Sequence, residues 1–322
     1  MAQAESPGRI TLWEIEVFVA TAEERSISAA ARRLGASASS VSQQISNLEV
    51  AVGTLLLNRR ERPVTLTPAG EMFRKRAYTI LNETAEAKAD LAKLDPTALT
   101  QLRLGMIEDF DASVTPTLLA HLATEMRSTQ FLLETGASHR LYDLLDTRGL
   151  DLIVAADMGA AADWMEIHPV LSEPFVAVVP KGGITGGEAL AQLKAMPLIQ
   201  YTKRHHMGRV LADHLARQNL TLAHRYELDS YHAIMAMVAS GAGWTILTPL
   251  GVTAAHRFLD QVDVLPLPFA PLSRTISLSA RRDVLGELPG QIASRLRQLV
   301  LDQVVTPSQQ RMTWLKDQLR LL

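Results

Sequence analysis

The chain has 322 residues, 47% of them hydrophobic and 20% charged, which suits two globular domains of unequal size. No window approaches about 18 consecutive apolar residues, so we expect no membrane span. The N-terminus lacks the basic-then-apolar layout of a signal peptide, so we expect a cytoplasmic protein. The absence of cysteine excludes disulfides, thiolate zinc sites and cysteine-based redox switches.

Charge is distributed unevenly along the chain. The formal net charge is −2, yet residues 28–76 carry eight basic and only three acidic side chains, so the remainder is acidic. A basic N-terminal region on an acidic protein indicates a DNA-binding module joined to a sensor domain.

Three short helices are predicted in the first fifty residues. Apolar residues recur at helical spacing over 12–22, where Leu12, Ile15, Val19 and Ala22 share a face. A second helix is expected over 28–34, with Ser28 as its N-cap and Gly35 in the left-handed turn that ends it. Ser37 is the expected N-cap of a third helix over 38–51.

The third helix has an uncharged exposed face. Val41, Ile45 and Leu48 fall on its buried side. Small polar groups and one amide lie roughly opposite: Ser39, Ser42, Gln43 and Ser46. Such a face can enter a major groove, where a glutamine pairs with adenine. An ordinary solvated helix surface would look the same, so both interpretations remain open here.

Residues 55–70 predict a short hairpin with a basic tip at 59–63, followed by a strand over 64–67. Helix, short helix, helix and basic hairpin, in this order, define a winged helix-turn-helix. The N-terminal region is therefore predicted to bind double-stranded DNA.

Over residues 26–70 the chain resembles the LysR family of transcriptional regulators. The residues that carry the likeness form one long pattern: Ser26, Ile27, Ser28, Ala30, Ala31, Leu34, Val41, Ser42, Gln44, Ile45, Leu48, Glu49, Gly53, Leu56, Arg59, Val64, Leu66, Thr67, Ala69 and Gly70. Members commonly carry Phe, Gln and Arg where this chain has Leu57, Ala38 and Gln43. These departures leave the predicted fold unchanged. They put in doubt that this chain prefers the same bases as its relatives.

Nine residues become candidates for DNA contacts, with Arg59 as the wing arginine of the family pattern: Arg33, Ser37, Ser39, Ser42, Gln43, Ser46, Arg59, Arg60 and Arg62. We assign residues 10–70 to the DNA-binding domain. For Arg59 the alternative is a solvated surface charge.

A long linker helix is predicted over 71–95. Its seam residues are separated alternately by four and three positions: Phe73, Ala77, Ile80, Thr84, Ala87, Leu91 and Leu94. LysR-like proteins dimerise through this helix, which implies a homodimer here and a tetramer by pairing of dimers. A helix that packs back on its own domain is the alternative. Asp95-Pro96 ends the helix.

Beyond Pro96, predicted strands and helices alternate, which indicates an α/β domain over 100–305. Strands are expected at 101–107, 130–135, 150–156, 173–179, 197–202 and 243–247. Helices are expected at about 115–127, 139–147, 206–218 and 230–240. The run at 150–156 is almost wholly apolar, as in a buried parallel strand.

The same segments resemble the two-lobed, periplasmic-binding-protein-like effector domain of LysR regulators. Its markers are Gly105 and the segments 150–154, 173–180 and 237–249. The resemblance implies a first lobe of about 100–171 plus 272–305, a second of about 172–271, and a small-molecule effector between them.

Six residues at strand ends or helix starts are candidate effector contacts: Asp109, Tyr201, Thr202, Lys203, Asp229 and Ser230. Family members often bind a carboxylate with hydroxyl groups at such places, and a helix start near Ser230 also favours an organic anion. Acidic residues at 108–111 favour an amine or a hydroxylated ligand instead. Thr202 and Ser230 are equally compatible with local capping, so the sign of the ligand stays open.

Two further segments carry weaker signals. The pair His205-His206 fits a surface loop better than a metal site, since no third ligand stands out, and we expect neither metal nor cofactor. Residues 306–322 predict a C-terminal helix with a stripe of Met312, Leu315, Leu319 and Leu322. It would dock on the effector domain or on a neighbouring subunit, unless it is a flexible tail.

The resemblance implies a bacterial, ligand-controlled transcriptional regulator, with RNA polymerase as a further partner. Effector binding would reorient the lobes and change how DNA-bound subunits are spaced. An α/β enzyme acting on a small metabolite is the alternative, but no phosphate loop, nucleophile elbow or metal-spaced cluster supports it. A transport-type binding protein is opposed by the DNA-binding module.

Overall fold

The computed structural model describes residues 9–59, 61–92, 99–111, 113–159 and 161–322. The chain divides into two compact units, an N-terminal one up to residue 98 and a C-terminal one that holds nearly all of the rest. Each unit has its own hydrophobic core.

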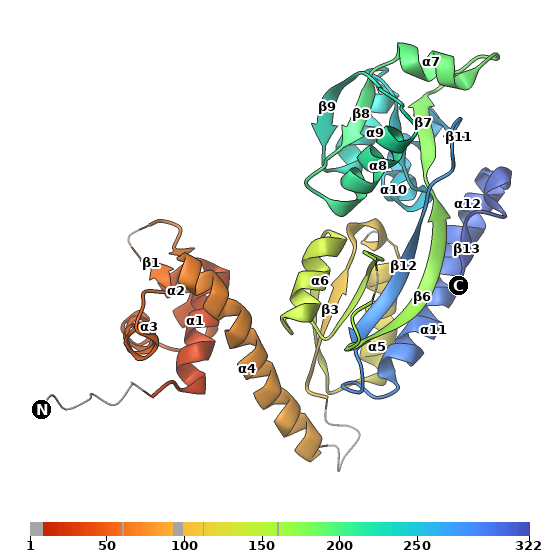
Figure 1. Ribbon diagram of the computed structural model, residues 1–322. Helices are drawn as coiled ribbons and strands as arrows, with labels where there is room; N and C mark the ends of the chain where they lie inside the picture. The colour runs from red at the N-terminus through yellow and green to blue at the C-terminus, as the bar shows by residue number, and fades with distance from the viewer. Residues whose placement is uncertain (1–8, 60, 93–98, 112, 160) are drawn as a thin grey trace, which may run out of the picture. The chain divides into compact units, whose positions relative to one another are not determined.

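The N-terminal unit is a winged helix-turn-helix, as predicted. Helices α1 (Leu12–Glu24), α2 (Ile27–Arg33) and α3 (Ala38–Val52) precede an antiparallel hairpin of β1 (Leu57–Asn58) and β2 (Thr65–Leu66). The long helix α4 (Pro68–Ala92) follows, shown in orange in Figure 1. The fully buried side chains of Phe18, Val41, Ile45 and Leu48 form the centre of the core.

The N-cap of α2 differs from the predicted one, whereas the N-cap of α3 is as predicted. Ser26, not Ser28, is the N-cap of α2, because the Ser26 backbone is extended and its hydroxyl accepts the Ala29 N–H at 3.3 Å, whereas Ser28 lies inside the helix. Ser37 caps α3 as predicted, with its hydroxyl 3.1 Å from the Ser40 N–H. Gly35 has the expected positive φ of 64°.

The wing strand is shorter than predicted. Only Thr65–Leu66 pairs with β1 as a strand, since the Val64 N–H donates to the Arg25 carbonyl at 2.9 Å. The Thr67 N–H still donates to the Leu56 carbonyl at 3.0 Å, while the Thr67 hydroxyl accepts the Gly70 N–H at 2.9 Å at the start of α4. Gly70 itself sits so close to Leu56 that a Cβ would lie 2.0 Å from the Leu56 carbonyl oxygen. This close approach explains glycine at that place in the family pattern.

The described seam residues of α4 include some that pack in the core of the N-terminal unit and others that are exposed. Phe73 packs edge-on against Phe18 with ring centroids 5.3 Å apart, and Ala77 is fully buried, so these two positions belong to the unit's own core. Ile80 is 39% exposed and Ala87 is exposed. Leu94 and the side chain of Leu91 lie outside the described residues. The seam is therefore not free over its full predicted length.

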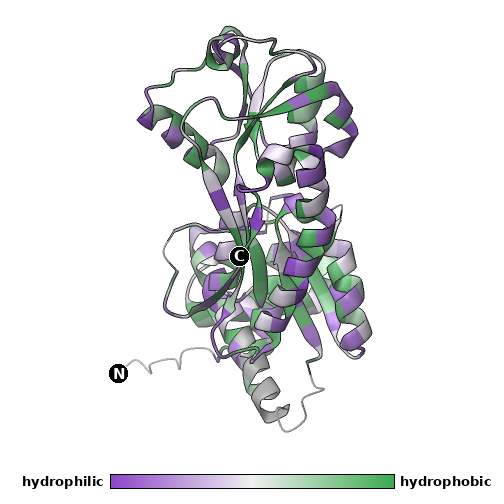
Figure 2. Cartoon of the chain, turned by 90° about the vertical axis from the view of Figure 1, so that its right-hand side faces the viewer, coloured by the Kyte–Doolittle hydropathy of each residue, from purple (hydrophilic) through white to green (hydrophobic). Residues whose placement is uncertain are grey.

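The described part of the C-terminal unit contains three sheets, of six, three and two strands (Figure 1). The largest has the order β13-β6-β12-β5-β3-β4 and forms what we call lobe 1. Its strands are β3 (Gln101–Met106), β4 (Gln130–Thr135), β5 (Leu152–Ala156), β6 (Met165–Pro174), β12 (Ser273–Arg281) and β13 (Arg320–Leu321). Figure 2 shows green, hydrophobic segments in the strands at the centre of this unit and purple segments on the surrounding helices.

The largest sheet is mixed rather than parallel. β3 runs parallel to β4 and β5, but β12 pairs antiparallel with both β5 and β6. The apolar strand β5 is thus parallel to a neighbour on one side only. Helices α5 (Val114–Glu125) and α11 (Leu288–Val300) pack together on one face, and α6 (Ser138–Asp146) lies on the other.

Lobe 2 surrounds the three-stranded sheet, in the order β10-β7-β11, and the parallel pair β8-β9. Its strands are β7 (Val176–Pro180), β8 (Leu198–Tyr201), β9 (His224–Leu228), β10 (Thr245–Leu247) and β11 (Val262–Pro266). Its helices are α7 (Ala189–Ala195), α8 (His206–Arg217), α9 (Tyr231–Ala239), α10 (Pro249–Ala254) and the 3-10 segment η2 (His256–Gln261).

Two segments cross between the lobes. The predicted strand at 173–179 is divided at Phe175 between β6 in lobe 1 and β7 in lobe 2. The chain returns between Pro266 and Ser273, from β11 to β12. No helix among the described residues is long and apolar enough to cross a membrane.

The C-terminal extension docks on its own C-terminal unit, but not as one helix. A π-helical turn η3 (Leu301–Val305), α12 (Thr306–Arg311) and η4 (Thr313–Leu315) lead into β13, which pairs antiparallel with β6. Met312, Leu315 and Leu319 are buried as expected, whereas Leu322 is 44% exposed. The single helical stripe was wrong because the chain turns at Met312 and ends as a strand.

Candidate DNA-binding and effector sites

Helix α3 presents the predicted polar face. Ser39 and Gln43 are exposed, while Ser42 and Ser46 are half-buried. The Gln43 amide donates to Asn47 at 2.9 Å, and the Ser46 hydroxyl donates to the Ser42 carbonyl at 2.9 Å. The Ser37 and Ser39 hydroxyls are 2.9 Å apart. Gln43 is thus oriented by a neighbour on its own helix, and the polar groups around it are uncharged.

The predicted wing arginine is tied to the recognition helix. Arg59 forms an ion pair with Glu49, whose side chain is 5% exposed, and donates to the Ser46 hydroxyl at 2.8 Å. Glu49 also accepts the backbone N–H groups of Leu56 at 2.8 Å and Leu57 at 3.1 Å. The Glu49–Arg59 pair therefore fixes the start of the wing to α3. Sequence reasoning found Arg59 and left Glu49 without a role.

The other basic residues predicted to contact DNA differ in whether acidic side chains already pair with them. Arg33 pairs with Glu23 at 2.5 Å and Glu24 at 3.4 Å, so its charge is compensated. Arg62 is exposed and donates to the carbonyls of Arg59 and Glu61 at 3.0 and 3.1 Å. Arg60 lies outside the described residues.

A cavity of about 230 Å³ lies between lobe 1 and lobe 2. Its lobe 1 side follows the carboxyl ends of β3, β4 and β5, with residues 107–109, 136–138 and 156–157, and includes 273–275 at the start of β12. Its lobe 2 side includes Tyr201, Tyr231 and residues 205–207. This is where ligands bind in open α/β sheets.

An arginine from lobe 1 is the centre of a buried cluster beside this cavity. Arg274 pairs with Asp109 at 2.5 Å and with Glu173 at 2.7 Å, and donates to the Thr248 hydroxyl at 3.1 Å. Glu173 is fully buried and also accepts the Leu250 N–H at 3.0 Å. The cluster joins segments of both lobes, since Thr248 and Leu250 belong to the start of α10.

The protonation equilibria in this cluster reflect burial and pairing. Burial raises the pKa of Glu173, and the attraction of Arg274 offsets this only in part. Burial acts to lower the pKa of Arg274, but attraction to Asp109 and Glu173 outweighs it and the pKa lies well above the ordinary value. Arg274 is therefore charged at any physiological pH.

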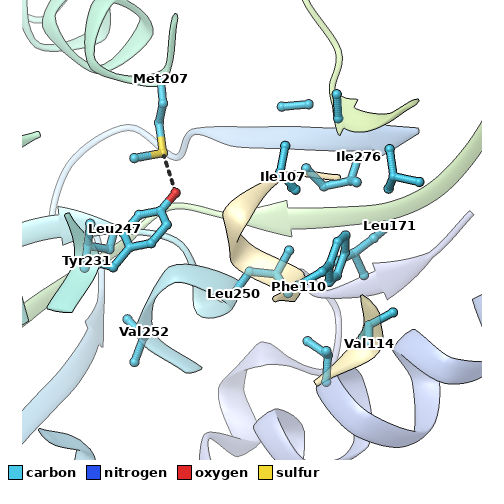
Figure 3. Packing of buried hydrophobic residues seen from close by; sticks show 14 of the residues in the cluster. Ile107, Phe110, Val114, Leu171, Met207, Tyr231, Leu247, Leu250, Val252 and Ile276 are labelled. Carbon is cyan, nitrogen blue, oxygen red and sulfur yellow. Dashed lines mark hydrogen bonds between the residues drawn. The ribbon is translucent and has the colours of Figure 1, made fainter. Parts of the chain in front are cut away.

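Two tyrosines cover the cluster from lobe 2. The Tyr231 hydroxyl donates to Asp109 at 3.3 Å and contacts the Met207 sulfur at 3.9 Å, the contact dashed in Figure 3. Tyr201 stacks on Tyr231 with centroids 5.5 Å apart, and its hydroxyl is 3.2 Å from His205 Nδ1. Burial, and then the Asp109 carboxylate, raise the pKa of both tyrosines. Both therefore remain neutral hydrogen-bonding groups.

Packing also joins the lobes next to this cluster. The 3-10 turn η1 (Glu108–Phe110) of lobe 1 contacts α10 of lobe 2. Figure 3 shows Phe110 of this turn beside Leu250 of α10. Asp109 is thus held on a turn that packs against the opposite lobe.

Only two of the six predicted effector residues, Asp109 and Tyr201, line the cavity. Four lie outside the lining. Thr202 is fully buried and donates to Glu227 at 2.7 Å, Asp229 pairs with Arg204 at 3.2 Å, and Ser230 is the N-cap of α9, its hydroxyl accepting the Ala233 N–H at 3.4 Å. Lys203 is exposed. Local capping therefore accounts for Ser230.

Sequence reasoning placed Tyr231 among the candidate contacts at the helix start 229–231, and this residue lines the cavity. It missed four other residues at the centre of the site: Glu173, Met207, Thr248 and Arg274. Arg274 is the second residue of a strand with alternating polar and apolar residues, which was the available signal. Histidines 205 and 206 line the cavity, and the His139 ring lies 5.7 Å from that of His205. Across the described part of the chain, no three metal-ligating side chains come together to hold a metal ion.

A winged helix-turn-helix and a two-lobed domain with a polar cavity define the class of ligand-responsive DNA-binding regulators. A family model for the "LysR substrate binding domain" matches residues 98–303, and one for the "Bacterial regulatory helix-turn-helix protein, lysR family" matches residues 12–71. The chain belongs to the LysR family of transcriptional regulators and is not an enzyme.

Relatives and solved structures agree with this assignment. A probable hydrogen peroxide-inducible genes activator of Mycobacterium avium is 30% identical over 294 residues, covering 88% of this chain and 93% of the relative. The uncharacterized regulator YfeR of Shigella flexneri is 26% identical over 245 residues, covering 75% and 79%. A full-length OxyR from Pseudomonas aeruginosa, in a form with one cysteine replaced by aspartate, matches with a TM-score of 0.68 at 24% identity. The match covers 90% of this chain and 95% of that one, which shows a shared fold.

Proposed function

We propose that a small molecule binds in the cavity beside Asp109, Tyr201, Tyr231 and Arg274 and thereby controls how this regulator binds DNA. The observation that carries the proposal is the Arg274 cluster, which takes groups from both lobes at the wall of the cavity. A ligand that contacts Asp109 and Tyr231 would act on both lobes at once. Its differential contacts would shift the equilibrium between lobe arrangements.

DNA recognition is assigned to α3 and the wing. We propose that Gln43 reads bases, that Ser37, Ser39, Ser42 and Ser46 support it, and that Arg59, Arg60 and Arg62 reach the backbone or minor groove. Arg33 has a lesser share because two glutamates compensate its charge. The segment of α4 from Ile80 onward, in which Ile80 and Ala87 are exposed, would pair two subunits, and two dimers would form a tetramer. A chain that binds chromosomal DNA would work in the cytoplasm, and as an activator it would contact RNA polymerase.

The signal is proposed to be a bound molecule rather than thiol oxidation. Several relatives are named as hydrogen peroxide-inducible activators, and solved OxyR structures carry substitutions at a cysteine. This chain has no cysteine, so thiol chemistry does not transfer to it.

A gel shift with the full chain and the DNA upstream of its own gene tests the proposal, repeated with a panel of metabolites. We expect retarded DNA and a metabolite that changes the affinity, and the Tyr231→Phe variant should respond less to that metabolite. The same tyrosine-to-phenylalanine change at Tyr226, on β9 and outside the cavity lining, serves as control. Failure to bind any DNA would rule out the proposed DNA-binding role.

A further inference from the structure

The cavity is lined by more acidic than basic side chains. Glu108, Asp109 and Asp157 line it, whereas Arg274 is the only arginine or lysine among the described lining residues. His205 and His206 add no charge at neutral pH, because burial, followed by His139 for the first and Arg209 for the second, lowers the pKa of each imidazole.

The single guanidinium is already committed to protein carboxylates. Arg274 is shared between Asp109 and Glu173, and its Nη1 atom approaches the Met207 sulfur at 3.7 Å. Because two carboxyl groups share this one guanidinium, the cluster holds no unpaired positive charge. A ligand carboxylate would have to compete with Asp109 and Glu173 for Arg274.

Glu108 and Asp157 are the carboxylates of the described lining without a basic partner. Burial, followed by repulsion from Asp109, Asp111 and Asp229, raises the pKa of Glu108. Burial also raises the pKa of Asp157, whose Oδ1 atom is buried without a hydrogen-bond partner. No cation contributes to either shift, so a cationic group in the cavity would remove an electrostatic cost that these two carboxylates carry.

These two carboxylates lie at one edge of the sheet. β3 and β5 are adjacent and parallel, with Met106 level with Val154, and Glu108 and Asp157 follow these strands by two and three residues. The Ile107 N–H extends the pairing to the Val154 carbonyl at 3.1 Å. One ligand group can therefore face both carboxylates.

We infer that the effector of this cavity is a small cation, an amine or a guanidinium, whose charged group lies between Glu108 and Asp157. The volume of about 230 Å³ fits a small metabolite, since drug-sized ligands take about 300–1,000 Å³. That this cation controls DNA binding rests on the proposed function. The charge of the ligand is opposite to that of the organic anion that the family resemblance favours.

Two matched trios of probes test the charge of the ligand: 1,4-diaminobutane, butane-1,4-diol and succinate, and benzylamine, benzyl alcohol and benzoate. Binding to the full chain is measured by calorimetry. We expect the amine of at least one trio to bind about tenfold or more tightly than its acid. Glu108→Gln and Asp157→Asn should each remove most of this preference, whereas Glu188→Gln, at an exposed carboxylate outside the cavity, should keep it.

Preference for the acids, absence of amine binding, or equal behaviour of the Glu108→Gln and Glu188→Gln variants would overturn the inference. Gel shifts on the same samples separate it from the proposed function. Acids that bind and alter DNA affinity would overturn the cationic ligand alone. Amines that bind through Glu108 and leave DNA affinity unchanged would support the cationic ligand and contradict the proposed control of DNA binding.

Discussion

The two units of this regulator use buried ion pairs differently. In the DNA-binding unit, Glu49 and Arg59 are ten residues apart and fix a wing to the helix just before it. In the effector unit, Arg274 reaches back 101 residues to Glu173 and 165 residues to Asp109. Thr248, which accepts from Arg274, and Leu250, which donates to Glu173, belong to the other lobe. The first pair fixes one hairpin to the preceding helix, and the second joins segments of two lobes.

This difference determines how far the structure should change when each ion pair is lost. Loss of the Glu49–Arg59 pair should loosen one hairpin, because the backbone links the same elements directly. Loss of Arg274 should alter the relation of the two lobes, which are also joined by two crossing segments near Phe175 and Ser273 and by the packing of η1 against α10. The effector unit is thus the part in which a small molecule can exchange one charge arrangement for another.

The largest expected effect follows from Arg274→Met, which leaves Asp109 and Glu173 buried without their cation. We expect the effector unit to lose about 3–5 kcal/mol of unfolding free energy. Urea titration followed by tryptophan fluorescence measures it, since Trp244 is fully buried in lobe 2.

Arg295→Met is the matched control for that variant. Arg295 also pairs with a carboxylate, at 2.6 Å from Glu125, but on the surface of the same unit. Its loss should shift the urea midpoint far less, because surface pairs contribute little. Equal midpoints for the two variants would show that the Arg274 cluster has no special role in stability.

A smaller effect is expected from Glu49→Gln, which keeps an acceptor for the Leu56 and Leu57 N–H groups but removes the ion pair with Arg59. We expect the DNA-binding unit to be destabilised by about 1–3 kcal/mol. Arg59→Ala should weaken DNA binding at all sequences and lower the slope of log affinity against log salt by about one. If Glu49→Gln lowers the slope as much, Arg59 acts on the wing's position and not as a DNA contact.

The same distinction between local and distant contacts decided what the sequence could predict. Periodicity located α1, α3, β3, β4 and the buried faces of the DNA-binding unit, because these depend on residues a few positions apart. Caps such as Ser37 were also accessible. The choice of Ser26 over Ser28 was missed because either serine can cap, and backbone geometry decides between them.

Strand pairing and the effector site depended on distant contacts. β12 alternates Ile276 and Leu278 with Ser277 and Ser279, yet all four are buried, so its central place was hidden by a pattern typical of a half-exposed strand. β13 is recognisable only beside β6. Asp109 was found as an acid at a strand end, but nothing local shows that Arg274 and Tyr231 lie against it.

A change in base preference is expected from Gln43→Ala on α3. A glutamine that pairs with adenine contributes about 1–3 kcal/mol of discrimination at one position, so selection of binding sites from random DNA should show one relaxed base pair. Asn47→Ala, which removes the 2.9 Å hydrogen bond to Gln43 but not the glutamine, is the control and should blur the same position less. An unchanged preference in Gln43→Ala would refute base reading by this residue.

The smallest effect concerns pH and separates the effector cavity from the rest of the protein. Because the pKa of Glu108 is raised in the folded state, the chain holds its proton more tightly when folded than when unfolded. This contribution to stability is fully present below the ordinary glutamate pKa of 4.5 and is lost as pH rises through the higher folded value. The parent chain should therefore lose stability relative to Glu108→Gln as pH rises from about 4 towards neutrality.

Urea midpoints of the parent and the variant at several pH values measure this difference. Subtracting one from the other cancels the opposite contribution of carboxylates with a lowered pKa, such as Asp263 beside Lys181, because both proteins contain them. Glu188→Gln provides the baseline for removing one carboxylate. A parallel course for the parent and both variants would mean that solvent compensates Glu108 fully, and the cavity would then have no electrostatic cost for a cation to relieve.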